Sequence, residues 1–172
     1  IAAMTREVAL FPEWYAPALG FEVDADGFFA AWREVWDGVL ADVEARPRMA
    51  RRDYHADNLM VLPGRADTLG LLDFLDALAG HAAYDLVSLL QDARRDVPPG
   101  LEEAMLERYC AAAGIVDAAT FRAHYEILGA QRNTKILGIF TRLWKRDGKP
   151  HYLPLQPRVW GYLERNLAHP AL

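Results

Sequence analysis

Hydrophobic side chains recur every three or four residues along much of the chain, which is the period of an amphipathic α-helix. Asp24 and Asp26 precede the first such run, over residues 27–45, and either can cap the helix that it predicts. The same period predicts a short helix over residues 86–90 and longer helices over 101–113, 118–146 and 156–167.

Two short apolar runs, residues 59–62 and 69–72, break this helical pattern. Residues 63–68 between them include Pro63 and Gly64, which favour a turn. The pattern predicts a β-hairpin of two buried strands joined by a loop longer than two residues. The fold class that we expect is therefore α+β and mostly helical.

Composition narrows the function classes. The chain has 172 residues, of which 52% are hydrophobic and 25% charged, as expected for one globular domain. A net charge of -5 argues against a nucleic-acid partner, which requires a cationic surface. The single cysteine, Cys110, excludes an intramolecular disulfide and a cysteine-based zinc cluster. No membrane span or signal peptide is visible, so we expect a cytoplasmic protein with no membrane partner.

Residues 51–58, Arg-Arg-Asp-Tyr-His-Ala-Asp-Asn, carry the clearest chemical signal. Asp53 precedes Asn58 by five residues, just before a predicted strand, which is the spacing of a kinase catalytic loop. The second strand then ends at Asp73, where kinase-like folds place a metal-binding carboxylate. An Asp–Asn pair alone often caps a turn. The order of loop, hairpin and second aspartate favours phosphoryl transfer.

The motifs Arg-Asp-Tyr-His-Ala-Asp-Asn-Leu-Met, Gly-Leu-Leu-Asp-Phe-Leu-Asp-Ala and Tyr-Asp-Leu-Val-Ser-Leu-Leu resemble the aminoglycoside phosphotransferase and choline kinase family. Within that family they are similar to the bacterial branch that phosphorylates N-acetylmuramate and N-acetylglucosamine at the anomeric hydroxyl in cell-wall recycling. The resemblance implies a protein-kinase-like fold, a hairpin that carries the catalytic and metal-binding loops, ATP and Mg²⁺ as cofactors, and an amino sugar as the small-molecule substrate.

The resemblance also implies roles for single residues. Asp53 matches the catalytic base, while Asn58 and Asp73 match the residues that hold the metal and, through it, the nucleotide. Asp76 falls where relatives often have a second acidic residue and is a further metal candidate, with a surface or capping role as the alternative. Asp85 matches a buried aspartate that accepts hydrogen bonds from the catalytic-loop backbone.

Two more residues of the loop, His55 and Asp57, are candidates for contact with the substrate. A structural hydrogen bond is the alternative for His55. Leu75 stands where a polar residue is expected after the Asp-Phe pair, which weakens the case for a second metal.

The nucleotide-gripping elements of a kinase are missing from the pattern. No Gly-x-Gly occurs, and the lysines are confined to positions 135, 145 and 149, downstream of the catalytic loop. We therefore expect this chain to be a C-terminal lobe without its N-terminal nucleotide-binding lobe. The C-terminal lobe alone is expected to be inactive. Its parts are a helical substrate-side segment (1–46), the catalytic loop and hairpin (47–80) and a helical bundle (81–172).

Two alternatives remain at this point. One is the same chemistry on another acceptor, such as an aminoglycoside or choline, whose positive charge favours an acidic pocket. The other is a non-catalytic, pseudokinase-like binding module, which the missing lobe favours and the intact Asp53, Asn58 and Asp73 disfavour. Basic residues at 132, 135, 142, 145 and 149 are interpreted as a solvated helix face.

Overall fold

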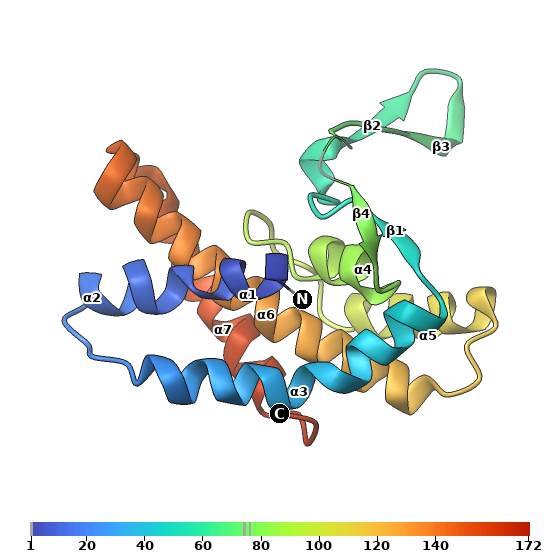
Figure 1. Ribbon diagram of the computed structural model, residues 1–172. Coiled ribbons are helices and arrows are strands. Elements are labelled where there is room, and N and C mark those ends of the chain that lie inside the picture. The colour runs from blue at the N-terminus through green and yellow to red at the C-terminus, as the bar shows by residue number, and fades with distance from the viewer. Residues whose placement is uncertain (1, 74, 76) are drawn as a thin grey trace. The chain divides into compact units, whose positions relative to one another are not determined.

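A computed structural model describes residues 2–73, 75 and 77–172 (Figure 1). The described chain is mostly helical with small antiparallel sheets, as the sequence predicts. The longer helices are α1 (Ala2–Val8), α3 (Ala25–Ala45), α4 (Ala83–Leu90), α5 (Leu101–Ala113), α6 (Ala118–Asp147) and α7 (Gln156–Leu167). Short helical turns are η1 (Phe11–Tyr15), α2 (Ala16–Ala18), η2 (Ala56–Asn58) and η3 (Pro150–Leu155). The strands are β1 (Arg48–Ala50), β2 (Leu59–Leu62), β3 (Arg65–Leu71) and β4 (Leu78–Gly80).

The predicted long helices are confirmed, with ends within two residues of those expected from the hydrophobic period. At the start of α3, the Gly27 backbone N–H donates to Asp24 Oδ1 at 3.1 Å. Asp24, one of the two candidates, is therefore the residue that caps α3.

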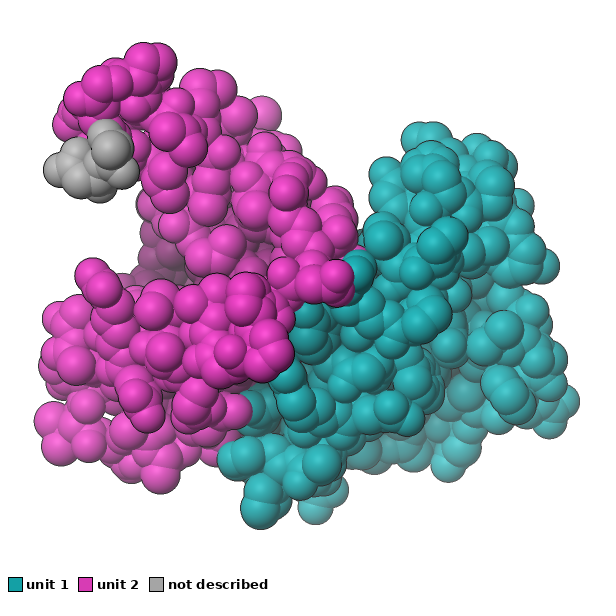
Figure 2. Space-filling view, turned by 180° about the vertical axis from the view of Figure 1, so that it is seen from behind, with its two compact units in different colours: residues 1–40, 126–172 teal, residues 41–125 magenta. Residues whose placement is uncertain are grey.

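Two compact units divide the chain, residues 1–40 with 126–172 and residues 41–125 (Figure 2). The core of the first unit is apolar and includes Val8, Trp32, Trp36, Leu128, Leu137, Phe140, Val159 and Leu163. Gly138 on α6 lies against the backbone of Leu10, because a Cβ at Gly138 would come within 2.5 Å of the Leu10 carbonyl. Only a residue without a side chain permits this approach.

A buried polar layer joins α6 and α7 inside the first unit. Asn166 on α7 donates from Nδ2 to Glu126 Oε2 at 2.6 Å and accepts at Oδ1 from Asn133 Nδ2 at 3.0 Å. A Cβ at Gly129 would meet Asn166 Nδ2 at 2.6 Å, so the glycine gives Asn166 its room. The layer satisfies polar groups that would otherwise be costly to bury.

The solvated basic face expected on the helix over 118–146 is wrong in part. Arg132 is buried, and Lys135 Nζ lies 2.9 Å from Glu7 Oε1 in a half-buried ion pair. Glu7 also accepts from Gln131 Nε2 at 2.9 Å. Lys135 and Gln131 are internal because Glu7 of α1 supplies them with a carboxylate.

In the second unit, β1 pairs antiparallel with β4, and β2 pairs antiparallel with β3 in the register Leu59↔Leu71 to Val61↔Leu69. The longer loop that the sequence predicts between the hairpin strands is wrong. Pro63 and Gly64 form the connection, because Gly64 adopts a φ of 71° and β3 begins already at Arg65. A bulge between Val61 and Leu62 absorbs the extra residues on the β3 side.

The prediction that the hairpin strands are buried is also wrong. Figure 1 shows β2 and β3 extending beyond β1 and β4. Val61 on β2 is 73% exposed, and Leu75, which follows β3, is 89% exposed. Exposed apolar side chains also include Met49, Met60, Leu69, Leu72 and Leu78, so this part of the second unit presents an apolar surface.

No helix in the described part of the chain combines the length and the apolar character needed to cross a bilayer.

Candidate active site

The segment that contains Asp53 is held at its base by α4. Strand β1 ends at Ala50, and Arg51 begins the segment. Strand β1 pairs with β4, and β4 is followed along the chain by α4. Asp85, in the first turn of α4, accepts hydrogen bonds from the backbone N–H groups of Arg51, at 3.0 Å, and Arg52, at 3.1 Å. Two backbone donors on one carboxylate fix the path of the chain directly before Asp53.

The backbone turns sharply at Arg52, which has a φ of 71°, a conformation that side-chain-bearing residues rarely adopt. Ser88 Oγ, one helical turn beyond Asp85 on α4, donates to the Arg52 carbonyl at 3.3 Å. A strained residue held by hydrogen bonds on both of its peptide groups is typical of a functional loop. The contribution of Ser88 cannot be predicted from the sequence, since a serine inside a helix carries no distinctive signal.

Asp53 and Asn58 are joined directly. Asn58 Nδ2 donates to the main-chain carbonyl of Asp53 at 2.8 Å, and the Asp53 carboxylate is exposed. The 3₁₀ turn η2 between them makes this contact, with the Asn58 N–H donating to the His55 carbonyl at 2.9 Å. Because the amide nitrogen of Asn58 is used in this way, its side-chain oxygen is the atom that can accept a cation.

Asp73 is brought beside Asn58 by the β2–β3 pairing. The Leu72 N–H donates to the Asn58 carbonyl at 3.0 Å, which continues the ladder by one residue beyond Leu59↔Leu71. Asp73 follows with a φ of 51° and an exposed side chain. The structure therefore gathers Asp53, Asn58 and Asp73 at one end of the hairpin. Asp76, the further metal candidate, lies outside the described residues.

His55, within the same loop, has a buried side chain. Its Nε2 lies 3.5 Å from Asn58 Nδ2, and its Nδ1 has no hydrogen-bond partner among the described residues. Burial, with the nearby positive charge of Arg94, lowers the pKa of His55. The ring is therefore neutral at pH 7, packed against the amide that holds Asn58 in place.

Asp57 is engaged by two arginines that follow α4. Arg95 Nη2 makes a short ion pair with Asp57 Oδ1, and Arg94 Nε lies 3.9 Å from Asp57 Oδ2. The hydrogen bond from Arg95 lowers the pKa of Asp57. Asp57 is predicted from the loop motif but its partners are not, because Arg95 lies 38 residues away along the chain, with Arg94 directly before it, and gives no local pattern.

The donor set has a clear chemical character. An amide oxygen and a carboxylate are the ligands that hard divalent cations such as Mg²⁺ prefer. An exposed carboxylate on the same loop, which hydrogen bonds tie to α4, can accept a proton from a hydroxyl group. The arrangement suits a reaction in which a cation-bound phosphate meets a hydroxyl.

This chain is similar in sequence to known proteins over most of its length. The model of the phosphotransferase enzyme family matches residues 2–125. A protein of Caulobacter vibrioides named N-acetylmuramate/N-acetylglucosamine kinase is 46% identical over 166 residues, covering 95% of this chain and 46% of that protein. Proteins of the same name from Pseudomonas aeruginosa and Neisseria meningitidis are 38% and 41% identical, covering 97% and 94% of this chain.

The chain spans about half the length of these relatives, 46% to 51% of each. The family match covers α1 to α3, the loop that carries Asp53, the hairpin, α4 and α5. By its sequence, and with Asp53, Asn58 and Asp73 at the end of one hairpin, this chain belongs to the phosphotransferase enzyme family.

Proposed function

We propose that this chain is the catalytic-loop part of an ATP- and Mg²⁺-dependent kinase that phosphorylates a hydroxyl group of an N-acetylated amino sugar. The printed names of the relatives support this substrate class. The observation that carries the proposal is the hydrogen bond from Asn58 Nδ2 to the Asp53 carbonyl, since it ties a candidate base to a candidate metal ligand. The cytoplasmic location expected from the sequence stays a prediction.

The residues present fit a magnesium ion. Asn58 has its side-chain nitrogen occupied and its oxygen available, and Asp73 supplies an exposed carboxylate at the adjoining end of β3. Asn58 and Asp73 would hold the ion, which when bound neutralises charge on the phosphates. Asp76 would be a further ligand.

Asp53 would act on the acceptor. Its carboxylate orients the sugar hydroxyl and takes up the proton as the hydroxyl oxygen bonds to the γ-phosphorus of ATP. The bond between that phosphorus and the β–γ bridging oxygen breaks, and ADP leaves. Most of the rate enhancement in such a transfer comes from positioning and electrostatics. Asp85 and Ser88 would serve it by fixing the backbone before Asp53.

The remainder of the full-length protein would bind the nucleotide. We propose that it is a lobe that precedes this chain and packs on the apolar surface of the hairpin. The exposure of Val61, Met60 and Leu69 supports a contact there that buries these side chains in the full-length protein. The isolated chain is then expected to have no useful turnover. The binding-module alternative predicts no turnover for the full-length protein either.

The test is an ADP-release assay on the full-length protein with ATP, Mg²⁺ and a panel of acceptors: N-acetylglucosamine, N-acetylmuramate, an aminoglycoside and choline. We expect turnover with the N-acetylated sugars. Asp53→Asn should lower kcat by about 10²–10⁴-fold, the usual contribution of a positioned base. Asp37→Asn, which changes an exposed carboxylate on α3, is the matched control and should be unaffected.

Asn58→Ala separates the roles of the two residues. It should raise the Mg²⁺ concentration needed for half-maximal rate by about 10–100-fold, with partial rescue at high Mg²⁺. Turnover only with the aminoglycoside or choline would reassign the acceptor. Full activity of Asp53→Asn would remove the proposed mechanism.

A further inference from the structure

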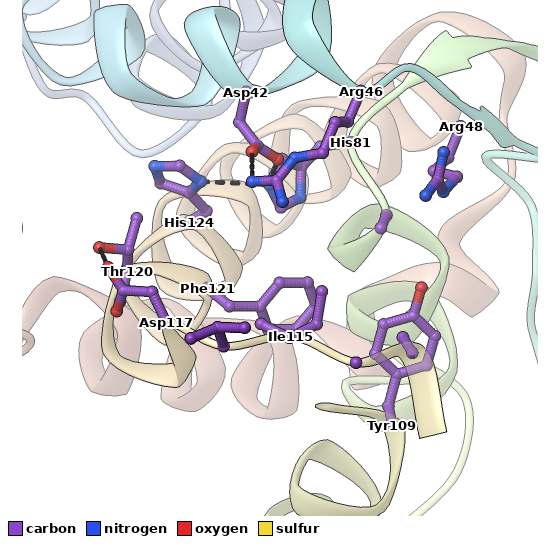
Figure 3. Close-up of a pocket in the computed structure, with 14 residues that line it drawn as sticks. Asp42, Arg46, Arg48, His81, Tyr109, Ile115, Asp117, Thr120, Phe121 and His124 are labelled. Atoms are coloured by element: carbon purple, nitrogen blue, oxygen red, sulfur yellow. Dashed lines mark hydrogen bonds and ion pairs between the residues drawn. The ribbon is translucent and has the colours of Figure 1, made fainter. Parts of the chain in front are cut away.

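Three side chains that commonly bind metals converge in the second unit, and the function proposed above uses none of them. They are Asp42 near the end of α3, His81 between β4 and α4, and His124 in α6. His81 Nε2 lies 2.9 Å from Asp42 Oδ2 and 3.1 Å from His124 Nδ1, and one ligand atom from each residue lies within 4.8 Å of the others. Figure 3 shows the three side chains pointing toward one another.

The cluster is buried on one side and open on the other. His81 is 3% exposed and His124 8% exposed, while Asp42 is half-buried. All three line a pocket of about 280 Å³, whose lining also includes Tyr109 and Phe121. An ion that entered through this pocket would meet two fixed imidazoles and a carboxylate and would keep room for water ligands.

The hydrogen bonds fix where the protons are. The backbone N–H of Ala83 donates to His81 Nδ1 at 3.0 Å, so Nδ1 carries a lone pair and a neutral His81 carries its proton on Nε2. That single proton faces both Asp42 Oδ2 and His124 Nδ1. A lone pair on each of these atoms therefore points at one proton, which is the position a cation would take.

The charge states of the three side chains agree with this placement of the protons. Burial, followed by the proximity of His124, lowers the pKa of His81 to about 4, and burial lowers the pKa of His124. Burial raises the pKa of Asp42, but the hydrogen bond from Arg46 and the neighbouring His81 outweigh it, and the net shift is downward. Both imidazoles are thus neutral and the carboxylate is ionised at pH 7, as metal ligands must be.

The remaining charged groups leave the site available. Arg46 Nη2 occupies Asp42 Oδ1 at 2.6 Å, which orients the carboxylate and leaves Oδ2 facing the histidines. Arg48 and Asp117 line the same pocket. Oδ1 of Asp117 accepts a hydrogen bond from the backbone N–H of Thr120 at 2.9 Å.

We propose that Asp42, His81 and His124 form a binding site for a divalent transition-metal ion of the zinc class, distinct from the magnesium site of the catalytic loop. Two imidazole nitrogens and one carboxylate oxygen are a ligand set that such ions favour over Mg²⁺. The ion takes the place of the Nε2 proton of His81. That proton moves to Nδ1, and the hydrogen bond from Ala83 is given up, since a metal-bound imidazole carries its proton on the other nitrogen.

This exchange gives the site a signature that ordinary surface histidines lack. Metal binding should convert His81 from the Nε2–H to the Nδ1–H tautomer. It should also free the Ala83 amide, in the first turn of the helix that carries Asp85. The loss of one hydrogen bond weakens the site relative to a preformed zinc centre.

The test uses the full-length protein, stripped of metal with a chelator and kept in excess Mg²⁺ to fill the catalytic-loop site. Zn²⁺ binding is measured by calorimetry, and Co²⁺ binding by its visible absorption. We expect one equivalent of either ion. Removing an outer-shell partner of a bound metal already costs about 10–100-fold in affinity, so His124→Ala and Asp42→Asn should weaken binding at least as much.

Two variants are matched controls. His151→Ala alters an exposed histidine of the first unit, and His55→Ala alters the buried histidine of the catalytic loop; neither should change the Zn²⁺ affinity. A loss of binding in His55→Ala with none in His124→Ala would overturn the proposal.

A measurement on the unmodified chain covers the case in which a variant fails to fold. Nitrogen-15 spectra of the His81 ring and hydrogen exchange of the Ala83 amide are recorded with and without Zn²⁺. The tautomer change and faster Ala83 exchange support the site. Zn²⁺ binding that leaves both signals unchanged, or no binding at all, reduces the cluster to a hydrogen-bonded trio and overturns the proposal.

Discussion

Asp85 holds a backbone segment 34 residues before it, accepting the N–H of Arg51 at 3.0 Å on each of its two carboxylate oxygens. Replacing it with alanine should leave the Arg51 and Arg52 amides without an acceptor. The expected loss of folding free energy is about 1–3 kcal/mol, the cost of unsatisfied buried donors. Urea unfolding of the variant measures it.

Asp85→Asn should be milder, because the amide keeps one acceptor oxygen. If Asp85 only positions Asp53, the full-length variant should lose kcat while its KM for ATP changes little. A fall in kcat that the unfolded fraction at the assay temperature fully accounts for would argue for a general loss of structure instead.

Burial of His81 makes the stability of the fold depend on pH. Its pKa is lowered from 6.5 to about 4, so the unfolded chain binds a proton there before the folded chain does. Stability is complete above pH 6.5 and falls as the pH drops toward about 4, by up to about 3 kcal/mol. Metal-free protein should show this slope in urea unfolding, His81→Gln should flatten it, and His151→Ala should leave it unchanged.

The exposed apolar residues of the hairpin should make the isolated 172-residue chain associate with itself. Val61 is 73% exposed, and its neighbours along β2 and β3 are also apolar. Val61→Lys should shift the chain toward monomer in light scattering, since a charge interrupts an apolar contact surface. A monomer at every concentration before the substitution would contradict this expectation. Arg65→Lys, at the start of β3, is a neutral comparison.

Two glycines of the first unit should respond in opposite ways to the same added methyl group. Gly138→Ala forces a Cβ against the Leu10 backbone and should destabilise the fold by about 1–3 kcal/mol. Gly161 lies inside α7 with nothing within 4 Å of the position that an added methyl group would take, so Gly161→Ala should stabilise the helix by about 0.5–1 kcal/mol. Thermal unfolding measures both, and shifts of the same sign would contradict the packing at Gly138.

Much of the helical architecture could be predicted from sequence because long amphipathic runs repeat their signal. The run over 118–146 predicts α6 almost to the residue. Strands β1 and β4 could not be predicted, because three residues each are too few to show a period of two. The length of the hairpin turn could not be predicted, because the residues after Gly64 pair as strand. The positive φ of Gly64 and the bulge at Val61 accommodate this pairing.

That Asp53, Asn58 and Asp73 lie close together could be predicted because they belong to one short, ordered motif, while their chemical roles stay predictions. Ser88 and Arg95, which hold that motif, could not, since their partners lie 36 and 38 residues away. The same limit applies to Asp42, His81 and His124. They come from three separate elements, and no spacing along the chain relates them.

The polar layer between α6 and α7 has a consequence for folding. If α7 slid by one turn along α6, Asn166 would lose both Glu126 and Asn133, and its amide would meet a Cβ instead of Gly129. An apolar seam tolerates such slippage, whereas a buried amide does not. Asn166 therefore fixes the register of α7 against α6. Leucine side chains alone would pack equally well in several registers.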